Sequence, residues 1–366
     1  MTTRILLCCL LVALSCSAVL GQAKRKIIID QDARGPATTD QQSMLMLLQA
    51  RDIETLGITI VSGDMWRDEE VAHTLRMLEL TGHTDMKVYP GAVFPLINSK
   101  EEIARWSKLY GKVSYQGTWN EHGSTITTKS SYHDPYVVPD LPEGNPKLKA
   151  EEEDAAHFII RMLHKYPGEI TIYAGGPLTN LAQVISLDPK APELAQELVI
   201  MGGSIGPDIE MSWKTANRRE FNFWFDPESV HITLRAPWKK VTVTTVDISV
   251  KTHMTKQMID QIAKAGTPSA DYIRKYSSDQ EFLWDELAVA AWLDPSIITH
   301  EEQLFMDMDI SHTAGYGNTL VWMKGEEPGL GERQVHVQTD LNVEKFNKMV
   351  VHLLSGSAAA KPAGIN

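Results

Sequence analysis

Short runs of apolar residues, each ending in polar or small residues, recur along the chain and predict buried β-strands. The first run, 26–30, ends in Asp30, and the second, 55–61, follows a helix-like stretch at 41–50. Helical stretches separate the later strand candidates, which are 170–174, 198–201 and 241–246. The alternation predicts an α/β fold, a doubly wound and mostly parallel sheet with helices on both faces.

The residues after the second strand candidate predict a helix and both of its ends. Val71, Leu75 and Leu78 share one helical face, acidic residues fill the first turn at 68–70, and Gly82 follows the end. Ligands in such a sheet bind beyond the carboxyl ends of the strands, so the residues after each strand candidate are the informative ones. The polar segment 111–151 is too long for a simple connection and is interpreted as an active-site lid.

The amino-terminal end has the order of a signal peptide. Arg4 precedes an uncharged apolar run at 5–20, and small residues follow around Gly21 and Ala23. An uncleaved membrane anchor is the alternative, but the run is short for a span of about 20 residues. The sequence therefore predicts a secreted or periplasmic protein.

The division of the chain follows from its two ends. We predict a signal peptide at 1–23, one α/β domain at 24–354 and a flexible tail at 355–366. All 3 cysteines lie in the signal segment, which excludes disulfides, thiolate zinc sites and cysteine nucleophiles from the mature domain.

Net charge and hydropathy limit the kinds of partner that the chain can bind. A net charge of -12 argues against a nucleic acid partner, because phosphate binding needs a basic surface. After the signal segment no stretch is long and apolar enough to span a bilayer, so no membrane contact is expected once that segment is cleaved. The oligomeric state stays open, a homo-oligomer included.

Carboxylates gather after the first strand candidate. Asp30 and Asp32 end that strand, and Asp40 opens the next helix. Three carboxylates in one turn region repel each other unless a cation lies among them, and Ca²⁺, which takes about 6–8 oxygen ligands, suits such a site. The alternative is a helix cap at Asp40 with solvated loop acids.

Two later clusters carry polar groups next to helices. Asp285 begins an apolar helical stretch and has the alternative role of a cap, while Glu220 and Asn222 stand in a polar and aromatic cluster that also reads as a surface loop. The G-x-S-x-G match at 202–206 follows a strand candidate, but no helix pattern follows it as a nucleophile elbow requires. A serine hydrolase is therefore disfavoured.

The order and spacing of these segments resemble those of nucleoside hydrolases over nearly all of the mature length. The matching segments are 27–32, 56–59, 175–180, 199–203, 220–222 with 226–227, and 285–290. The resemblance implies that Asp32 is the general base. It implies a Ca²⁺ site formed by Asp30, Asp32, Asp40, Asp285 and the backbone carbonyl of Thr179. It also implies a sugar pocket formed by Met201, Glu220 and Asn222.

The sequence departs from the family pattern beside the implied metal site. Three extra residues separate Asp32 from Asp40, and Thr39 replaces an aspartate that contacts a ribose hydroxyl in the family. Arg34 lies in the inserted stretch, where a cation near calcium is costly unless it faces outward or meets a carboxylate. Asp64 stands where many members have asparagine, and we predict that it takes over the lost ribose contact. The alternative is a pocket that accepts a different sugar or a larger riboside.

The leaving-group side departs as well. Trp284 stands where many members have a histidine that acts as an acid, and we predict that its indole lines the pocket and stacks on the base. His122, His133 and Tyr316 are weaker candidates for the missing acid. The predicted function is hydrolysis of the N-glycosidic bond of ribonucleosides or related N-ribosides by a Ca²⁺-activated water. The alternative is an exported, non-hydrolytic riboside-binding protein on the same fold.

Overall fold

The structure is a computed structural model that describes residues 23–113, 115–120, 132–206, 218–279 and 281–356. Nearly all of the predicted signal peptide and of the predicted tail lies outside these residues. His122 also lies outside them.

The described strands form one nine-stranded sheet with the order β3-β2-β1-β4-β5-β6-β9-β7-β8. The strands are β1 (Arg25–Gln31), β2 (Ile53–Ile60), β3 (Val88–Pro90), β4 (Ile170–Ala174), β5 (Glu197–Met201), β6 (Val241–Thr244), β7 (Ile298–Met308), β8 (Thr319–Trp322) and β9 (Arg333–Leu341). Every pairing from β3 to β9 along this order is parallel, whereas β7 pairs antiparallel with both β8 and β9. The prediction of an α/β, mostly parallel sheet is confirmed.

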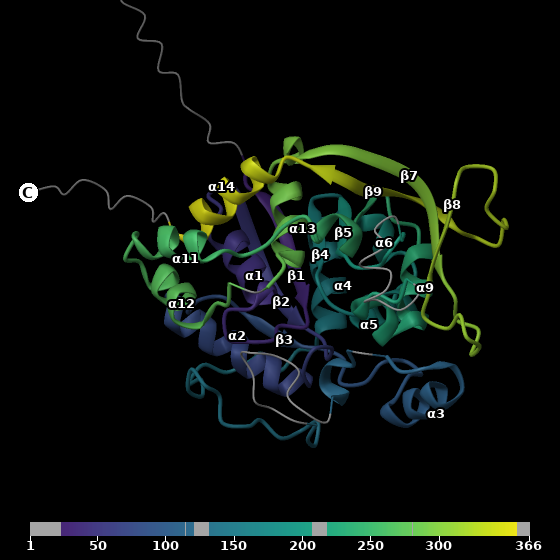
Figure 1. Cartoon of the computed structure of the whole chain (residues 1–366), viewed down its shortest axis with the longest axis horizontal. Helices are drawn as coiled ribbons and strands as arrows, with labels where there is room; N and C mark the ends of the chain where they lie inside the picture. Colours follow the sequence, from purple (N-terminus) through teal and green to yellow (C-terminus); the bar gives the residue numbers. More distant parts are fainter. Residues whose placement is uncertain (1–22, 114, 121–131, 207–217, 280, 357–366) are drawn as a thin grey trace, which may run out of the picture.

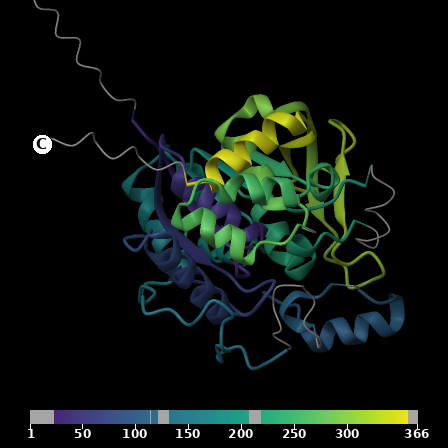
Figure 2. The same ribbon diagram turned by 60° about the vertical axis from the view of Figure 1, so that its left-hand side comes forward.

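Alternation along the strands divides the apolar core into two layers. Ile27 and Ile29 of β1 face one layer and Ile28 faces the other. The first layer is covered by α1 (Thr39–Gln49), α2 (Arg67–Thr81) and α10 to α14, which are Val246–Ser249, Lys256–Ala263, Pro268–Tyr276, Trp284–Leu293 and Val343–Leu354. The second is covered by α4 (Ala155–Lys165), α5 (Thr179–Leu187), α6 (Ala191–Leu194) and α9 (Pro227–Arg235). Figures 1 and 2 show these two groups of helices on either side of the sheet.

The predicted elements before residue 250 recur with small shifts at their ends. The helix predicted from 68–82 is α2, and Gly82 follows it in the left-handed conformation, with φ 82°, that an L side chain rarely adopts. The helix α3 (Lys100–Tyr110) lies apart from both layers (Figure 1). Within the described ranges, no helix combines the length and apolar character needed to cross a bilayer.

The strand order reverses between β1 and β4. The chain runs outward from β1 through β2 to β3 and then returns to β4, which pairs with the other side of β1. Such a switch point leaves a crevice outside the carboxyl ends of the two strands, where open α/β sheets bind ligands. Asp32 directly follows β1 and Gly175 directly follows β4, so both lie at this switch point of the sheet.

Candidate active site

A cavity of about 290 Å³ opens at the carboxyl ends of the central strands. Its size is close to the lower end, about 300 Å³, of small-molecule pockets. The structure brings eight of the predicted site residues into its lining, namely Asp32, Asp40, Asp64, Met201, Glu220, Asn222, Trp284 and Asp285. They come from loops and helix starts after β1, β2 and β5 and from α13, so the switch point gathers segments that are far apart in sequence.

Asp32 is enclosed in a narrow slot at the floor of this cavity. A Cβ added to Gly63 or to Gly176 would overlap its carboxyl group, so both positions require glycine for a close approach. The Asp64 backbone N–H donates to Oδ2 of Asp32 at 3.0 Å. Burial raises the pKa of Asp32 well above its usual range, and the neighbouring carboxylates Asp64 and Asp40 raise it further.

Asp40 and Asp285 flank a single amide. Nε2 of Gln31 donates to Oδ1 of Asp40 at 3.3 Å and to Oδ1 of Asp285 at 3.2 Å. The Tyr173 hydroxyl also donates to Oδ1 of Asp285, at 2.7 Å. Burial raises the pKa of Asp285 to about 6. Uncompensated carboxylates in such a dry site favour a bound cation.

The donor set of this cluster suits a hard cation. Asp32, Asp40 and Asp285 offer carboxylate oxygens, and Oε1 of Gln31 is buried without a hydrogen-bond partner beside them. These are the oxygen ligands that Ca²⁺ prefers. In the described part of the chain, no three Asp, Glu, His or Cys side chains are already drawn together as a metal group.

Two of the residues assigned to the metal do not line the cavity. Asp30 is buried outside the cavity lining, and its Oδ1 accepts hydrogen bonds from Thr59 at 2.6 Å and from Asn180 at 2.7 Å. Its Oδ2 is buried and unpartnered. The Thr179 hydroxyl donates to Asp226 at 2.6 Å, and the residue begins α5 outside the cavity lining.

Glu220 and Asn222 line the same cavity as Asp32. Glu220 caps the short helix α8 (Phe221–Phe225), and its carboxylate accepts backbone N–H groups of Asn222, Phe223 and Gly203. The Asn222 amide donates to the carbonyl oxygens of Gly175 at 2.8 Å and Met201 at 3.2 Å. These bonds fix both side chains at the cavity before any ligand binds.

Burial raises the pKa of Glu220 from 4.5 to about 7, although three backbone N–H groups oppose the shift. Between these values the folded state binds more protons than the unfolded state, so the free energy of unfolding falls as pH rises. We expect the melting temperature of Glu220→Gln, relative to native protein, to rise from pH 4.5 to pH 7 in metal-free buffer.

A carboxylate away from the cavity gives the control for this measurement. Hydrogen bonds from Lys345 and Ser296 lower the pKa of Asp294 below 3.8. Its contribution is then lost only below the pH window used, and lysine and serine side chains do not change charge within that window, so Asp294→Asn should show a constant difference from native protein. A Glu220→Gln difference that is equally constant would contradict the shift.

Arg34 meets carboxylates inside the cavity. Its guanidinium lies 2.9 Å from Oδ2 of Asp64 and 3.5 Å from Oε1 of Glu281. The Tyr115 hydroxyl donates to Oδ1 of Asp64 at 2.6 Å and accepts from Arg34 at 3.2 Å. Asp64 is therefore held in place by a cation and a phenol, and the charge of Arg34 is compensated.

Hydrogen bonds fix the inserted loop that carries Arg34. The Ala37 N–H lies 3.0 Å from Oε1 of Gln41 and 3.1 Å from the Tyr272 hydroxyl, and Gln42 donates to the Ala37 carbonyl at 2.8 Å. Thr39 also lines the cavity, but its hydroxyl is already engaged: it donates to Glu286 at 2.6 Å and accepts from the Asp285 N–H at 3.1 Å.

Trp284 begins α13 and lines the cavity beside Asp285, with its ring 4.7 Å from that of Phe282. The weaker acid candidates lie elsewhere: His133 bonds to Glu69 at 2.8 Å, and the Tyr316 hydroxyl bonds to Glu228 at 3.0 Å. Neither residue belongs to the cavity lining.

Sequence reasoning missed three lining residues, Tyr115, Phe221 and Val246. Tyr115 comes from the segment interpreted as a lid. Nearby, the Thr118 N–H donates to the Gly63 carbonyl at 2.9 Å, and a Cβ on Gly117 would overlap that carbonyl oxygen. This close packing brings Tyr115 over Asp64. In the sequence, the glycine at 117 is the feature that could have indicated this close approach.

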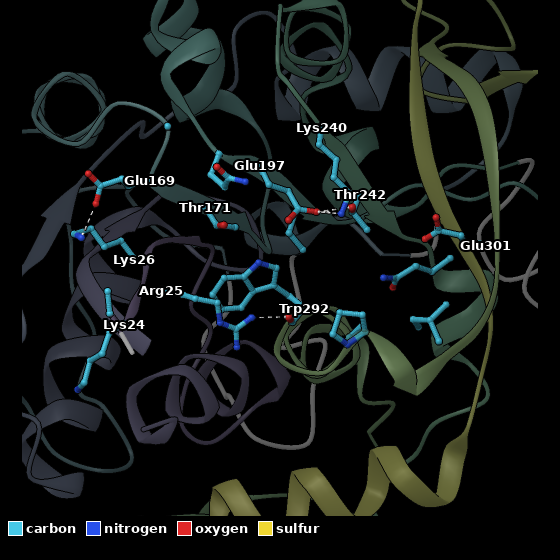
Figure 3. Close-up of a pocket in the computed structure, with 18 residues that line it drawn as sticks. Lys24, Arg25, Lys26, Glu169, Thr171, Glu197, Lys240, Thr242, Trp292 and Glu301 are labelled. Atoms are coloured by element: carbon cyan, nitrogen blue, oxygen red, sulfur yellow. Dashed lines mark hydrogen bonds and ion pairs between the residues drawn. The ribbon is translucent and has the colours of Figure 1, made fainter. Parts of the chain in front are cut away.

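A second cavity, of about 530 Å³, lies at the opposite, amino-terminal ends of the parallel strands (Figure 3). Its charged groups compensate each other, since Lys26 lies 2.7 Å from Glu169 and Lys240 lies 2.6 Å from Glu197. The Arg25 guanidinium covers the Trp292 ring at 4.4 Å. This cavity is larger but holds neither a carboxylate cluster nor an open catalytic group among its described lining residues.

Comparison with known proteins agrees with the geometry. The model of the inosine-uridine preferring nucleoside hydrolase family matches residues 27–348. Uridine nucleosidase 1 of Arabidopsis thaliana is 26% identical over 89% of this chain and 91% of its own length. The inosine-uridine preferring nucleoside hydrolase of Leishmania major is 25% identical over 90% and 97%. The solved purine-preferring ribonucleoside hydrolase from Gardnerella vaginalis superposes with a TM-score of 0.70 at 22% identity, over 91% of this chain and 98% of that one.

The fold and the acid-rich cavity at its switch point define an α/β protein with a small-molecule site. The family match covers most of the chain, so the chain belongs to the inosine-uridine preferring nucleoside hydrolase family.

Proposed function

We propose that this chain hydrolyses the N-glycosidic bond of ribonucleosides or related N-ribosides. The observation that carries the proposal is the placement of Asp32, which is held in a glycine-lined slot at the floor of the switch-point cavity. The same cavity is lined by Asp40, Asp285, Glu220 and Asn222. Membership of the nucleoside hydrolase family supports the same reaction.

In this mechanism Asp32 holds a water below the anomeric carbon and accepts its proton as the C–O bond forms. The transition state resembles an oxocarbenium ion, so the surrounding carboxylates stabilise the positive charge that develops on the sugar. Asn222 and Glu220 orient the ribose hydroxyls, because their own hydrogen bonds to backbone keep them in one position.

Calcium is the metal that the donor set favours. Asp32, Asp40 and Asp285 would hold it, with Gln31 and Asp30 as buried neighbours whose unpartnered oxygens lie close by in the sequence. When bound, the ion would supply Lewis acidity that lowers the pKa of a coordinated water. The backbone carbonyl of Thr179 remains a proposed ligand from the family resemblance.

A panel of ribosides tests the function. Purified mature protein with Ca²⁺ should release free base and reducing sugar in equal amounts, without added phosphate. Binding of ribosides without release of sugar would instead support the non-hydrolytic binding protein.

Asp64 is proposed to accept a ribose hydroxyl with the lone pairs that Arg34 and Tyr115 leave free. A hydrogen bond to a charged group contributes about 1.5–3 kcal/mol, so Asp64→Ala should lower kcat/KM for ribosides about tenfold to about a hundredfold. Native enzyme should also turn over 2′-deoxyribosides poorly.

Tyr115→Phe is the matched variant, because it removes one hydrogen bond to Asp64 but keeps the carboxylate. It should reduce kcat/KM less than Asp64→Ala does and preserve the preference for ribosides. Equal turnover of ribosides and 2′-deoxyribosides by native enzyme would overturn the assignment of Asp64.

We also propose that the protein is exported and acts as a secreted or periplasmic enzyme. The order of charged, apolar and small residues at 1–23 supports this, as does the absence of cysteine after that segment. Amino-terminal sequencing of protein recovered outside the cytoplasm should find a new terminus near residue 24. An intact Met1 on the exported protein would contradict cleavage.

A further inference from the structure

The cavity lining includes three aromatic residues, Trp284, Tyr115 and Phe221. The rings of Tyr115 and Phe221 lie 4.8 Å apart. No histidine or lysine is among the described lining residues. The Tyr115 hydroxyl is committed to Asp64 at 2.6 Å, and burial raises its pKa well above the usual range. A departing base therefore meets no histidine, lysine or uncommitted phenol among the described lining residues that could protonate it.

The same cavity has more acidic than basic side chains in its lining. It holds the carboxyl groups of Asp32, Asp40, Asp64, Glu220 and Asp285 against one cation, Arg34. Arg34 does not add free positive charge, because Asp64 and Glu281 both contact it. When fully ionised, this lining keeps a net negative formal charge even with one divalent ion bound. A neutral base gains little from this field, whereas a cationic heterocycle is attracted by it.

Trp284 provides the matching surface. A tryptophan face is the best of the side-chain partners for a cation, and the attraction is larger in a desolvated site. The indole stands directly before Asp285 at the start of α13, so a ring stacked on it would lie close to the carboxylate cluster. Phe282, at 4.7 Å, backs the indole from outside the lining.

We infer that the preferred substrates are N-ribosides of cationic aromatic heterocycles, that is, N-ribosylpyridinium compounds. The inference rests on the proposed function and names its substrate class. Three observations support it: the aromatic residues of the lining, the lack of a histidine or lysine among the described lining residues, and the compensated charge of Arg34.

The reaction balances without an acid. Water adds its oxygen to C1′ and gives one proton to Asp32, while the C1′–N bond breaks and its electron pair returns to the ring nitrogen. The positive charge of the pyridinium is thereby neutralised, and the products are ribose, a neutral pyridine and one proton. A neutral nucleoside, by contrast, must lose its base as an anion or receive a proton during departure.

The test compares nicotinamide riboside, a cation, with uridine and inosine, which are neutral, on native protein with Ca²⁺. Since a general acid contributes about 10²–10⁴-fold, kcat/KM for nicotinamide riboside should exceed that for the neutral nucleosides by at least about 100-fold. Trp284→Phe should keep most of this preference because it keeps a ring face. Trp284→Ala should raise KM for nicotinamide riboside.

Trp284→His adds an acid, so it should raise kcat for uridine while lowering kcat/KM for nicotinamide riboside. Trp292→His is the matched control, because Trp292 lies on the same helix but outside the cavity, beside Arg25. It should leave the ratio of the two substrates unchanged. Similar kcat/KM values for both substrates, or hydrolysis of uridine alone, would overturn the inference and leave the proposed function standing. If neither substrate released ribose, the proposed function itself would fail.

Discussion

Asp32→Asn should reduce kcat by about 10²–10⁴-fold, the contribution of a positioned general base, with a small change in KM. Asparagine has nearly the same shape, so it fits the slot between Gly63 and Gly176. It still accepts the N–H of Asp64, but it cannot take a proton from water. Steady-state kinetics on a hydrolysed riboside measures both parameters.

Asp307→Asn is the control for a loss that reflects folding alone. Asp307 is as buried as Asp32, with 3% and 2% of their surfaces exposed, but it lies on β7 and pairs with Arg235. Its substitution should lower the melting temperature and leave kcat unchanged. If Asp32→Asn kept more than about a tenth of native kcat, Asp32 would not be the base.

Removal of divalent cations should abolish turnover, and Ca²⁺ should restore it. Lewis-acid stabilisation of this kind contributes several kcal/mol, so we expect a loss of at least about 10²–10³-fold. Asp40→Ala and Asp285→Ala should lose calcium affinity in titration calorimetry, because each removes a carboxylate that flanks the Gln31 amide.

Glu286→Gln is the control that distinguishes loss of a metal ligand from loss of a nearby carboxylate. Glu286 follows Asp285 directly and is fully buried, but it accepts the Thr39 hydroxyl and does not line the cavity. This variant should bind calcium as native protein does. Full activity of native protein in excess chelator would contradict the role of the metal.

The central sheet could be predicted because its strands are buried on both faces. Segments such as 26–30 then become continuous apolar runs, which a single sequence displays directly. The antiparallel edge was not predicted. Most of the first half of β7 is exposed or half-buried. Its residues 299–303 are polar, so this stretch shows no continuous apolar run. Its pairing with β9 depends on contacts across the fold.

The site was predictable where residues follow strands and unpredictable where distant loops fold over it. Asp32 directly follows β1 and Asp64 lies in the short loop after β2, so the sheet largely sets their position. Tyr115 reaches the cavity only because Gly117 packs against Gly63. The orientation of Arg34 likewise depends on Asp64 and Glu281, which no local pattern connects to it.

The central claim is that a water held by Asp32 attacks the anomeric carbon of an N-riboside. Its most direct test follows the C1 resonance of ribose by NMR, during turnover of a [1′-¹³C]riboside in H₂¹⁸O. The resonance of the first ribose released should carry the isotope shift of an ¹⁸O label, ahead of the slow exchange seen with ribose alone. The account would be contradicted if the first ribose were unlabelled, or if the sugar left as anything other than free ribose.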